Sequence, residues 1–178
     1  MSAAKPAPAT ERKLPRVDLR KLVGGGVAGR REAVALIGDA LRHEGAVRVE
    51  GHASADPDAL AEVGIQLLAA LAEYFGLAPN AFAAGVASEA EPGWGEEGAL
   101  LVVLAGVPPG TELRARASDW RPITAHPGEL AAAPCGALSA LTAGVVPSAA
   151  VRWPAGTTSA VALAVPPGAA LAALPEFR

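Results

Sequence analysis

The sequence predicts an α+β fold in which N-terminal helices pack on a jelly-roll-like sheet. The chain has 178 residues, of which 51% are apolar and 19% charged, as expected for a single globular domain. Two segments of the first half, 30–43 and 56–74, carry apolar residues at helical spacing. The second half consists of short apolar or alternating segments separated by Pro and Gly, which is typical of a β-sandwich or jelly roll.

We expect a tail followed by one domain. Residues 1–13 are rich in Ala and Pro and lack the apolar core of a signal peptide, so they are expected to form a flexible tail. The domain covers residues 14–178. It divides into a helical part over 14–85 and a reduced sheet part over 98–178.

The first elements are a strand, a loop and a helix. Leu14–Leu19 predicts a short strand, and the triple glycine Gly24–Gly26 predicts a loop. This glycine run lacks the spacing of phosphate-binding motifs. A helix is expected over Arg30–His43, because apolar residues recur along one of its faces, and Gly45 is expected to end it.

A second strand and a second helix follow. Ala46–Glu50 alternates apolar and charged residues, which predicts a strand with one buried face. Asp56 followed by Pro57 is typical of a helix N-terminus, and helical spacing continues to Tyr74. Pro79 and Asn80 are expected to open a shorter helical piece that ends near Gly85.

The second half is expected to form a sheet. An acidic, glycine-containing link is predicted over Glu89–Gly98, and it separates the helical part from the strands. The expected strands are Leu100–Leu104, Glu112–Ala117, Trp120–Ile123, Leu130–Ala133, Ala149–Trp153 and Ser159–Val165.

Charge is distributed unevenly along the chain. Up to His52 there are ten Lys and Arg against six Asp and Glu, whereas residues 53–112 contain nine Asp and Glu and no Lys or Arg. These two regions are either solvated faces or attract each other, within the molecule or between copies. The acidic stretch argues against binding of nucleic acid, which needs an uncancelled basic patch.

A single cysteine, Cys135, excludes an intrachain disulfide, and we interpret it as a small buried apolar residue. The longest apolar run, Ala99–Val107, is too short to cross a bilayer. We therefore expect a cytoplasmic protein that does not bind membranes.

Several motifs of the chain match sequence runs of one known family. Glu44–His52 resembles the run W-G-F-F-x-V-x-G-H-G. Asp119-Trp120 with Pro127–Leu130 resembles W-x-x-V…P-G-A-L, and Leu141–Gly144 with Ser148–Arg152 resembles T-N-G…S-x-x-H-R. These motifs resemble those of isopenicillin N synthase-like, non-haem iron(II) and 2-oxoglutarate-dependent oxygenases, and the resemblance implies a double-stranded β-helix. It is expected to be shortened here, because family members carry several dozen more residues in the middle.

The family's iron site needs two His and one carboxylate, and its co-substrate site needs an Arg-x-Ser pair. The resemblance puts Trp94 at the first His, Glu96 at the carboxylate and Val151 at the second His. Thr157 stands at the arginine, and Ser159 retains the serine. Because indole and isopropyl groups donate no lone pair to iron, we expect no metal and no cofactor.

Two functions stay open. The first is a pseudo-oxygenase that binds a small organic molecule or acts as a scaffolding partner, as a homo-oligomer or in a complex with another protein, because a reduced jelly roll exposes strand edges. The second is a cofactor-independent cyclase, isomerase or lyase. Its catalytic acid/base would be Glu96, in a vacated pocket formed by Trp94, Glu96, Val151, Thr157 and Ser159. Whether the acidic segment 89–97 binds a cation or a basic partner also stays open.

Overall fold

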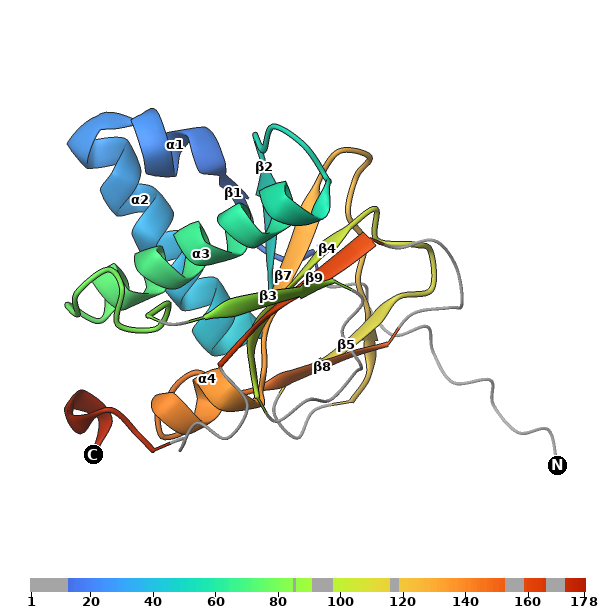
Figure 1. The fold of residues 1–178 in the computed structure, drawn as a ribbon. Coiled ribbons are helices and arrows are strands. Elements are labelled where there is room, and N and C mark those ends of the chain that lie inside the picture. Colours follow the sequence, from blue (N-terminus) through green and yellow to red (C-terminus); the bar gives the residue numbers. More distant parts are fainter. Residues whose placement is uncertain (1–12, 85, 91–97, 116–118, 153–158, 166–171) are drawn as a thin grey trace, which may run out of the picture.

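Two β-sheets pack face to face, and helices cover the outer face of the larger sheet (Figure 1). This arrangement comes from a computed structural model, which describes residues 13–84, 86–90, 98–115, 119–152, 159–165 and 172–178. The predicted order, helices first and sheet second, is confirmed.

The strands, as the structure has them, are β1 (Arg16–Asp18), β2 (Val47–Glu50), β3 (Ala87–Ala90), β4 (Ala99–Ala105), β5 (Glu112–Ala115), β6 (Arg121–Pro122), β7 (Leu130–Pro134), β8 (Ala149–Arg152) and β9 (Ser159–Ala164). In the described part of the chain, the larger sheet has the order β1-β2-β7-β4-β9-β3 and the smaller sheet the order β6-β5-β8. Only β1 and β2 pair in parallel among these strands.

The helices are α1 (Leu19–Gly24), α2 (Gly26–Asp39), α3 (Pro57–Tyr74) and α4 (Gly136–Leu141). A π-helical turn, Ala40–Glu44, extends α2, and a 3₁₀ turn, Pro175–Phe177, lies near the C-terminus. None of the helices that the structure describes has the length and apolar character needed to span a bilayer.

The strongest local predictions are confirmed. Asp56 caps α3, because its Oδ1 accepts a hydrogen bond from the Ala59 amide over 2.9 Å, and Pro57 occupies the first turn. Gly45 ends the segment that begins with α2, and its φ of 79° lies in the left-handed region that glycine adopts without strain.

Two predictions for the helical part were wrong. The expected loop at Gly24–Gly26 is only a break at Gly25 between α1 and α2. α1 forms because Asp18 caps it and because Leu19 and Leu22 are buried. The segment after Pro79 is a single turn closed by bonds to the carbonyl of Asn80, too short to continue as a helix.

Two elements were missed in the sheet part. Residues 87–90, partly assigned to the acidic link, form β3, which pairs with β9 at the edge of the larger sheet. Their sequence, Ala-Ser-Glu-Ala, has no apolar alternation that would have indicated a strand. The short helix α4 has no side-chain cap and buries only Ala137 and Leu138, so its signal was weak.

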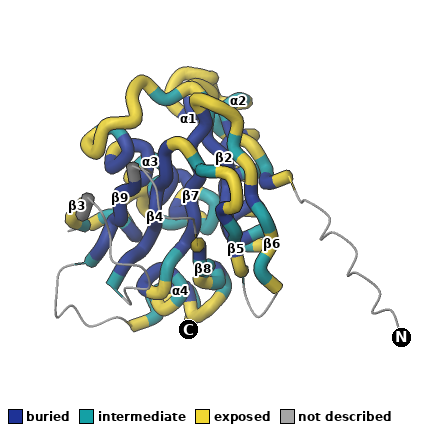
Figure 2. The backbone as a smooth tube through the Cα atoms, turned by 90° about the vertical axis from the view of Figure 1, so that its right-hand side faces the viewer, coloured by how far each residue is buried: buried dark blue, intermediate teal, exposed yellow. Residues whose placement is uncertain are grey.

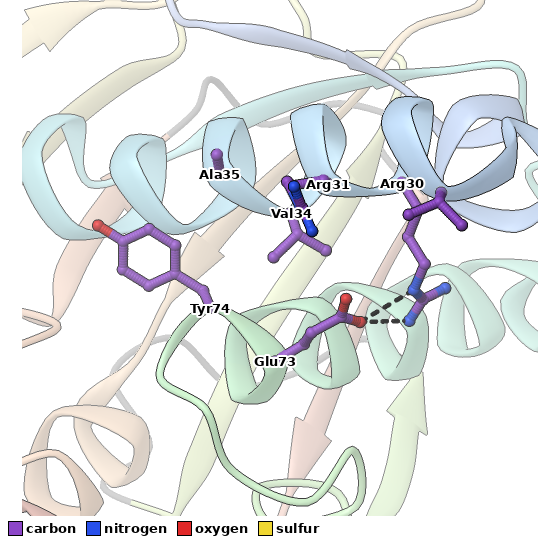
Figure 3. Close-up of a pocket in the computed structure, with 7 residues that line it drawn as sticks. Arg30, Arg31, Val34, Ala35, Glu73 and Tyr74 are labelled. Carbon is purple, nitrogen blue, oxygen red and sulfur yellow. Dashed lines mark hydrogen bonds and ion pairs between the residues drawn. The ribbon is translucent and has the colours of Figure 1, made fainter.

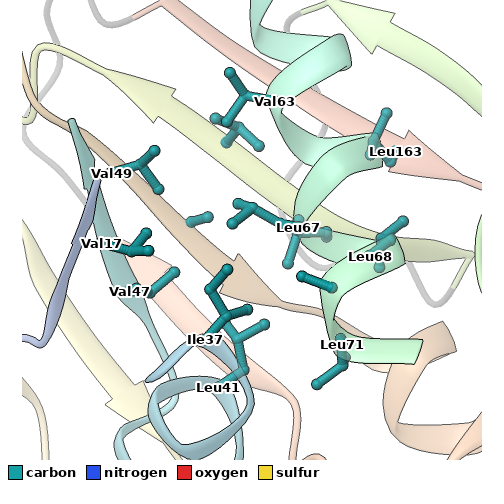
Figure 4. Packing of buried hydrophobic residues seen from close by; sticks show 14 of the residues in the cluster. Val17, Ile37, Leu41, Val47, Val49, Val63, Leu67, Leu68, Leu71 and Leu163 are labelled. Carbon is teal, nitrogen blue, oxygen red and sulfur yellow. The ribbon is translucent and has the colours of Figure 1, made fainter. Parts of the chain in front are cut away.

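The central strands of the larger sheet, β2, β7, β4 and β9, are buried, as their dark colour in Figure 2 shows. Along β4, Leu101 and Val103 face the helices, whereas Val102 and Leu104 face the smaller sheet. Figure 4 shows the helix-side cluster, in which Ile37 of α2 and Leu67 of α3 pack over the sheet. The second cluster, between the two sheets, contains Val151, one of the predicted site residues.

Helix α2 packs so closely on α3 that a side chain at Gly38 would overlap the ring of Tyr74. A Cβ built at Gly38 would lie 2.2 Å from two atoms of that ring. We expect Gly38→Ala to lower the free energy of unfolding by about 1–3 kcal/mol in urea denaturation. Gly29→Ala, in the same helix with its nearest neighbour at 3.8 Å, is the matched control and should raise it by about 0.5–1 kcal/mol. A gain of stability in both variants would contradict the close contact.

Candidate functional site

The space between the two sheets is lined by small and branched apolar side chains. Val151, on β8 of the smaller sheet, is 8% exposed and belongs to this inter-sheet cluster. Its neighbours in the cluster come from both sheets. They are Leu14, Ala46, Val102, Leu104, Leu113, Ile123, Ala131, Ala133 and Ala160. Val151 is therefore held in an apolar layer inside the sandwich.

The other predicted site residues are placed only in part. Trp94, Glu96 and Thr157 lie outside the described residues, and so do Glu91 and Glu97 of the acidic segment. Ser159 begins β9 and pairs with Ala105 of β4. Val151 and Ser159 thus lie on strands of different sheets, and the structure leaves their grouping with Trp94 and Glu96 as a prediction.

A buried ion pair lies on the side of β2 that faces away from the helices. Arg48 is 9% exposed and Glu129 5% exposed. Arg48 Nη1 lies 3.2 Å from Glu129 Oε2, and its Nε donates to the carbonyl of Leu14 over 3.0 Å. Glu129 also accepts a hydrogen bond from the His126 amide over 2.9 Å, and Arg16 lies 3.7 Å from its Oε1. This polar cluster ties β1, β2 and the start of β7 together.

Sequence reasoning missed this cluster. The alternation of Ala46–Glu50 predicted one buried, apolar face, with Arg48 on the opposite face. In the structure Val47 and Val49 face the helices, while Arg48 is buried on the opposite face beneath the segment at Leu14. The charge alternation of a strand cannot show that a second layer covers its polar face. The one available signal was the match of Pro127–Leu130 to the family motif P-G-A-L, in which Glu129 replaces the alanine.

The neighbours of Glu129 decide its charge state. Burial raises the pKa of this carboxyl, but the His126 amide and the charges of Arg48, His126 and Arg16 outweigh burial, so the pKa lies below its ordinary value. Glu129 is therefore an ionised structural group at neutral pH, rather than a proton donor.

Cys135 follows β7 and packs against the inter-sheet cluster. Burial raises the pKa of its thiol to about 12. Its Sγ lies 3.8 Å from the carbonyl oxygen of Ala133. A thiol in these surroundings is protonated at neutral pH and does not act as a nucleophile.

The histidines do not assemble a metal site in the part of the chain that the structure describes. No group of three or more His, Cys, Asp or Glu side chains suited to a metal occurs there. His52 ends the motif Glu44–His52 that matches the family. Its Nδ1 is buried and has no hydrogen-bond partner among the described residues.

Two hollows lined by described residues flank helix α2. The first, about 390 Å³, lies between α2 and α3 and is lined by Val27, Arg30, Arg31, Val34, Ala35, Glu73 and Tyr74 (Figure 3). The second, about 560 Å³, is lined by Pro15, Leu36, Asp39, Ala40, His43 and Glu44. The first lies on the helical side of the molecule, whereas the second includes Pro15, which follows Leu14 of the inter-sheet cluster.

Comparisons with known proteins place the fold. No protein-family model matches the sequence, and no curated protein matches it. Solved structures match well. The dioxygenase for auxin oxidation 1 from Arabidopsis thaliana, in its 2-oxoglutarate complex, gives a TM-score of 0.72 at 14% identity, over 93% of this chain and 99% of that chain.

Two further structures give the same fold. A full-length Neurospora crassa protein, solved in complex with alpha-KG, gives a TM-score of 0.71 at 10% identity, over 98% of this chain and 92% of that chain. The rice dioxygenase for auxin oxidation gives a TM-score of 0.68 at 16% identity, over 93% of this chain and 87% of that chain. The chain therefore has the mixed α+β fold of 2-oxoglutarate-dependent iron(II) oxygenases, with N-terminal helices on a double-stranded β-helix, as the motifs predicted. That the fold is shortened stays a prediction.

This fold implies an iron ion and 2-oxoglutarate. Whether the chain fits the iron depends on which metal-donating groups lie at the expected position. Val151, which the resemblance puts at the second histidine, presents a hydrocarbon group inside an apolar cluster. An isopropyl group has no lone pair to donate to iron(II), and its apolar neighbours offer no replacement. The described residues around Val151 do not fit the iron.

Proposed function

We propose that this oxygenase-fold protein is a pseudo-oxygenase, which holds neither iron nor 2-oxoglutarate and acts by association with a protein partner. The observation that carries the proposal is Val151. Its buried isopropyl group stands where the family's second histidine is expected, within a layer of apolar side chains. Iron(II) sites of this kind require two histidines and a carboxylate on one face of the metal.

The packing of the inter-sheet layer supports a structural role for this space. Its members are mostly Ala, Val and Leu, and each of the ten buried residues is at most 8% exposed. A polar ligand such as 2-oxoglutarate would need charged or hydrogen-bonding groups in place of these side chains. The buried charged side chains of the described residues, Arg48 and Glu129, already form an ion pair with each other. They therefore offer no free charge to such a ligand.

Metal loading and co-substrate binding test the proposal. The purified protein is incubated under nitrogen with iron(II) and 2-oxoglutarate, desalted, and analysed for iron by mass spectrometry. We expect far less than one iron per chain. We also expect no rise of the melting temperature with 2-oxoglutarate, since a ligand that binds the native state stabilises it.

A known 2-oxoglutarate oxygenase, treated in parallel, is the positive control. One iron per chain together with conversion of 2-oxoglutarate to succinate would overturn the proposal. The alternative, a cofactor-independent enzyme, depends on Glu96 as its acid/base. Because Glu96 lies outside the described residues, no observation of the structure favours that function.

A further inference from the structure

Three large apolar side chains are exposed in the described part of the chain, and they lie on two neighbouring surfaces. Val23 and Val27 are 70% and 80% exposed, on α1 and at the start of α2, and Ile65 is 41% exposed on α3. Val27 lines the hollow between α2 and α3. Exposed apolar residues beside a hollow mark an interaction surface more often than isolated ones do.

The hollow carries one positive charge that no described residue compensates. Arg30 is neutralised, because its Nε and Nη2 donate to Glu73 Oε2 over 2.9 and 2.6 Å, as Figure 3 shows. Its Nη1 also donates to the carbonyl of Leu22 over 3.0 Å. Arg31, on the same wall, is exposed and makes no ion pair or hydrogen bond within the described residues. The hollow thus combines an apolar wall with an available guanidinium group.

The outer face of α3 is apolar and acidic, so it complements the apolar and positively charged hollow. Asp58, Glu62, Ile65, Ala69 and Glu73 follow at intervals of four and three residues, so they form one stripe along the helix. Asp58 and Glu62 are exposed next to Ile65. The segment around them, 53–112, contains no Lys or Arg. This stripe is therefore apolar and acidic, and its C-terminal end, Glu73, lines the hollow.

From these observations we infer that the hollow between α2 and α3 binds the acidic stripe of α3 from a second copy of the chain. The proposed pair is two-fold symmetric, with Ile65 of each copy against Val27 of the other. Arg31 of each copy faces Glu62 of the other. The pair deepens the proposed function by naming its partner. The inference rests on the proposed function only because both give the protein a role in association. Iron loading and self-association are measured separately, so either can fail without the other.

Symmetry fixes the register of the pair. If Ile65 of one copy lies beside Glu73 of the other, then antiparallel α3 helices cross midway between these positions, at Ala69. Ile65 and Glu73 are about 12 Å apart along the helix, at 1.5 Å per residue. Ala69 is half-exposed, and its methyl group allows two helices to approach closely at the crossing. A closed pair uses the same surface on both copies.

Charge exchange tests the contact. Sedimentation velocity over a concentration series should show a dimer, and Arg31→Glu or Glu62→Arg should each raise its dissociation constant at least about tenfold, since each change juxtaposes like charges. A mixture of the two variants should form the dimer again, because residues 31 and 62 of the two copies then carry opposite charges at both contacts. Arg121→Glu, an equal change of charge at an exposed arginine of the smaller sheet, should leave the dimer unchanged.

Cross-linking tests the register. Ala69→Cys should give a disulfide-linked dimer under mild oxidation, whereas Ala140→Cys, at an exposed alanine of α4, should not. Far-UV circular dichroism checks that each variant is folded. A monomer at every concentration would overturn the inference, as would a dimer that Arg31→Glu does not weaken. Concentration-dependent polymers in place of a dimer would overturn the two-fold arrangement.

Discussion

Replacing Arg48 by methionine is expected to lower the free energy of unfolding by about 3–5 kcal/mol at pH 7. The substitution retains an apolar chain of similar length but removes the guanidinium group. It leaves the Glu129 carboxylate, whose side chain is 6% exposed, without its buried partner. The loss is large because the buried Glu129 charge keeps its desolvation cost and retains only the His126 amide and the exposed Arg16 as partners. Urea denaturation followed by circular dichroism measures it.

The loss should depend on pH in one direction. The pKa of Glu129 lies below its ordinary value of 4.5, so its ionised form stabilises the native state above that pH. This stabilisation disappears as the pH falls through the lowered pKa. The difference between the wild type and Arg48→Met should therefore be greatest near neutral pH and shrink in acid.

A double variant separates the charge effect from packing. Arg48→Met combined with Glu129→Leu replaces the ion pair by apolar groups, and we expect it to be more stable than Arg48→Met alone. If the double variant loses the sum of both single losses, the two residues do not interact. A loss that stays constant down to pH 3 would contradict the role given to the Glu129 charge.

Replacing Leu67 by alanine should lower the free energy of unfolding by about 2–5 kcal/mol. Leu67 is fully buried where α3 packs over the larger sheet. α3 lies so close to the sheet that a Cβ at Gly64, one turn earlier, would meet Leu163 at 2.5 Å. The sheet strands below are paired on both sides, so they cannot move to fill the cavity.

Ile65→Ala is the matched control on the same helix. Ile65 is 41% exposed, so its truncation should change the free energy of unfolding by no more than about 0.5 kcal/mol in dilute, monomeric protein. Equal losses at the two positions would show that α3 does not pack as described. Thermal and urea denaturation should rank the two variants in the same order.

Much of the fold could be predicted because its signals are local. The cap at Asp56 and the apolar face of α3 fix that helix within its own sequence, and Gly45 marks the end of the preceding one. The central strands β4 and β7 are apolar throughout, so their segments stood out between Pro and Gly turns. β3 gave no such signal, because its strand conformation comes from pairing with β9.

The candidate site could be predicted only as far as a motif match extends. The motif register identified Val151, and the structure shows that its side chain is buried. The ion pair of Arg48 and Glu129 joins residues 81 positions apart, and no sequence periodicity reveals such a partner. The hollow beside α2 also arises from tertiary packing, since its lining comes from two helices that meet only in the folded chain.

The order of strands in the larger sheet constrains how the chain folds. Apart from β1 and β2, none of its neighbouring strands are consecutive in the sequence, and β4 pairs with β9, which ends at Ala164. During synthesis the apolar strand β4 therefore has to wait for more than fifty further residues before both of its edges are covered. Until then the helices can form, but the sheet on which they pack is incomplete. We expect such a chain to fold slowly and to expose β4 to aggregation until β9 has been synthesised.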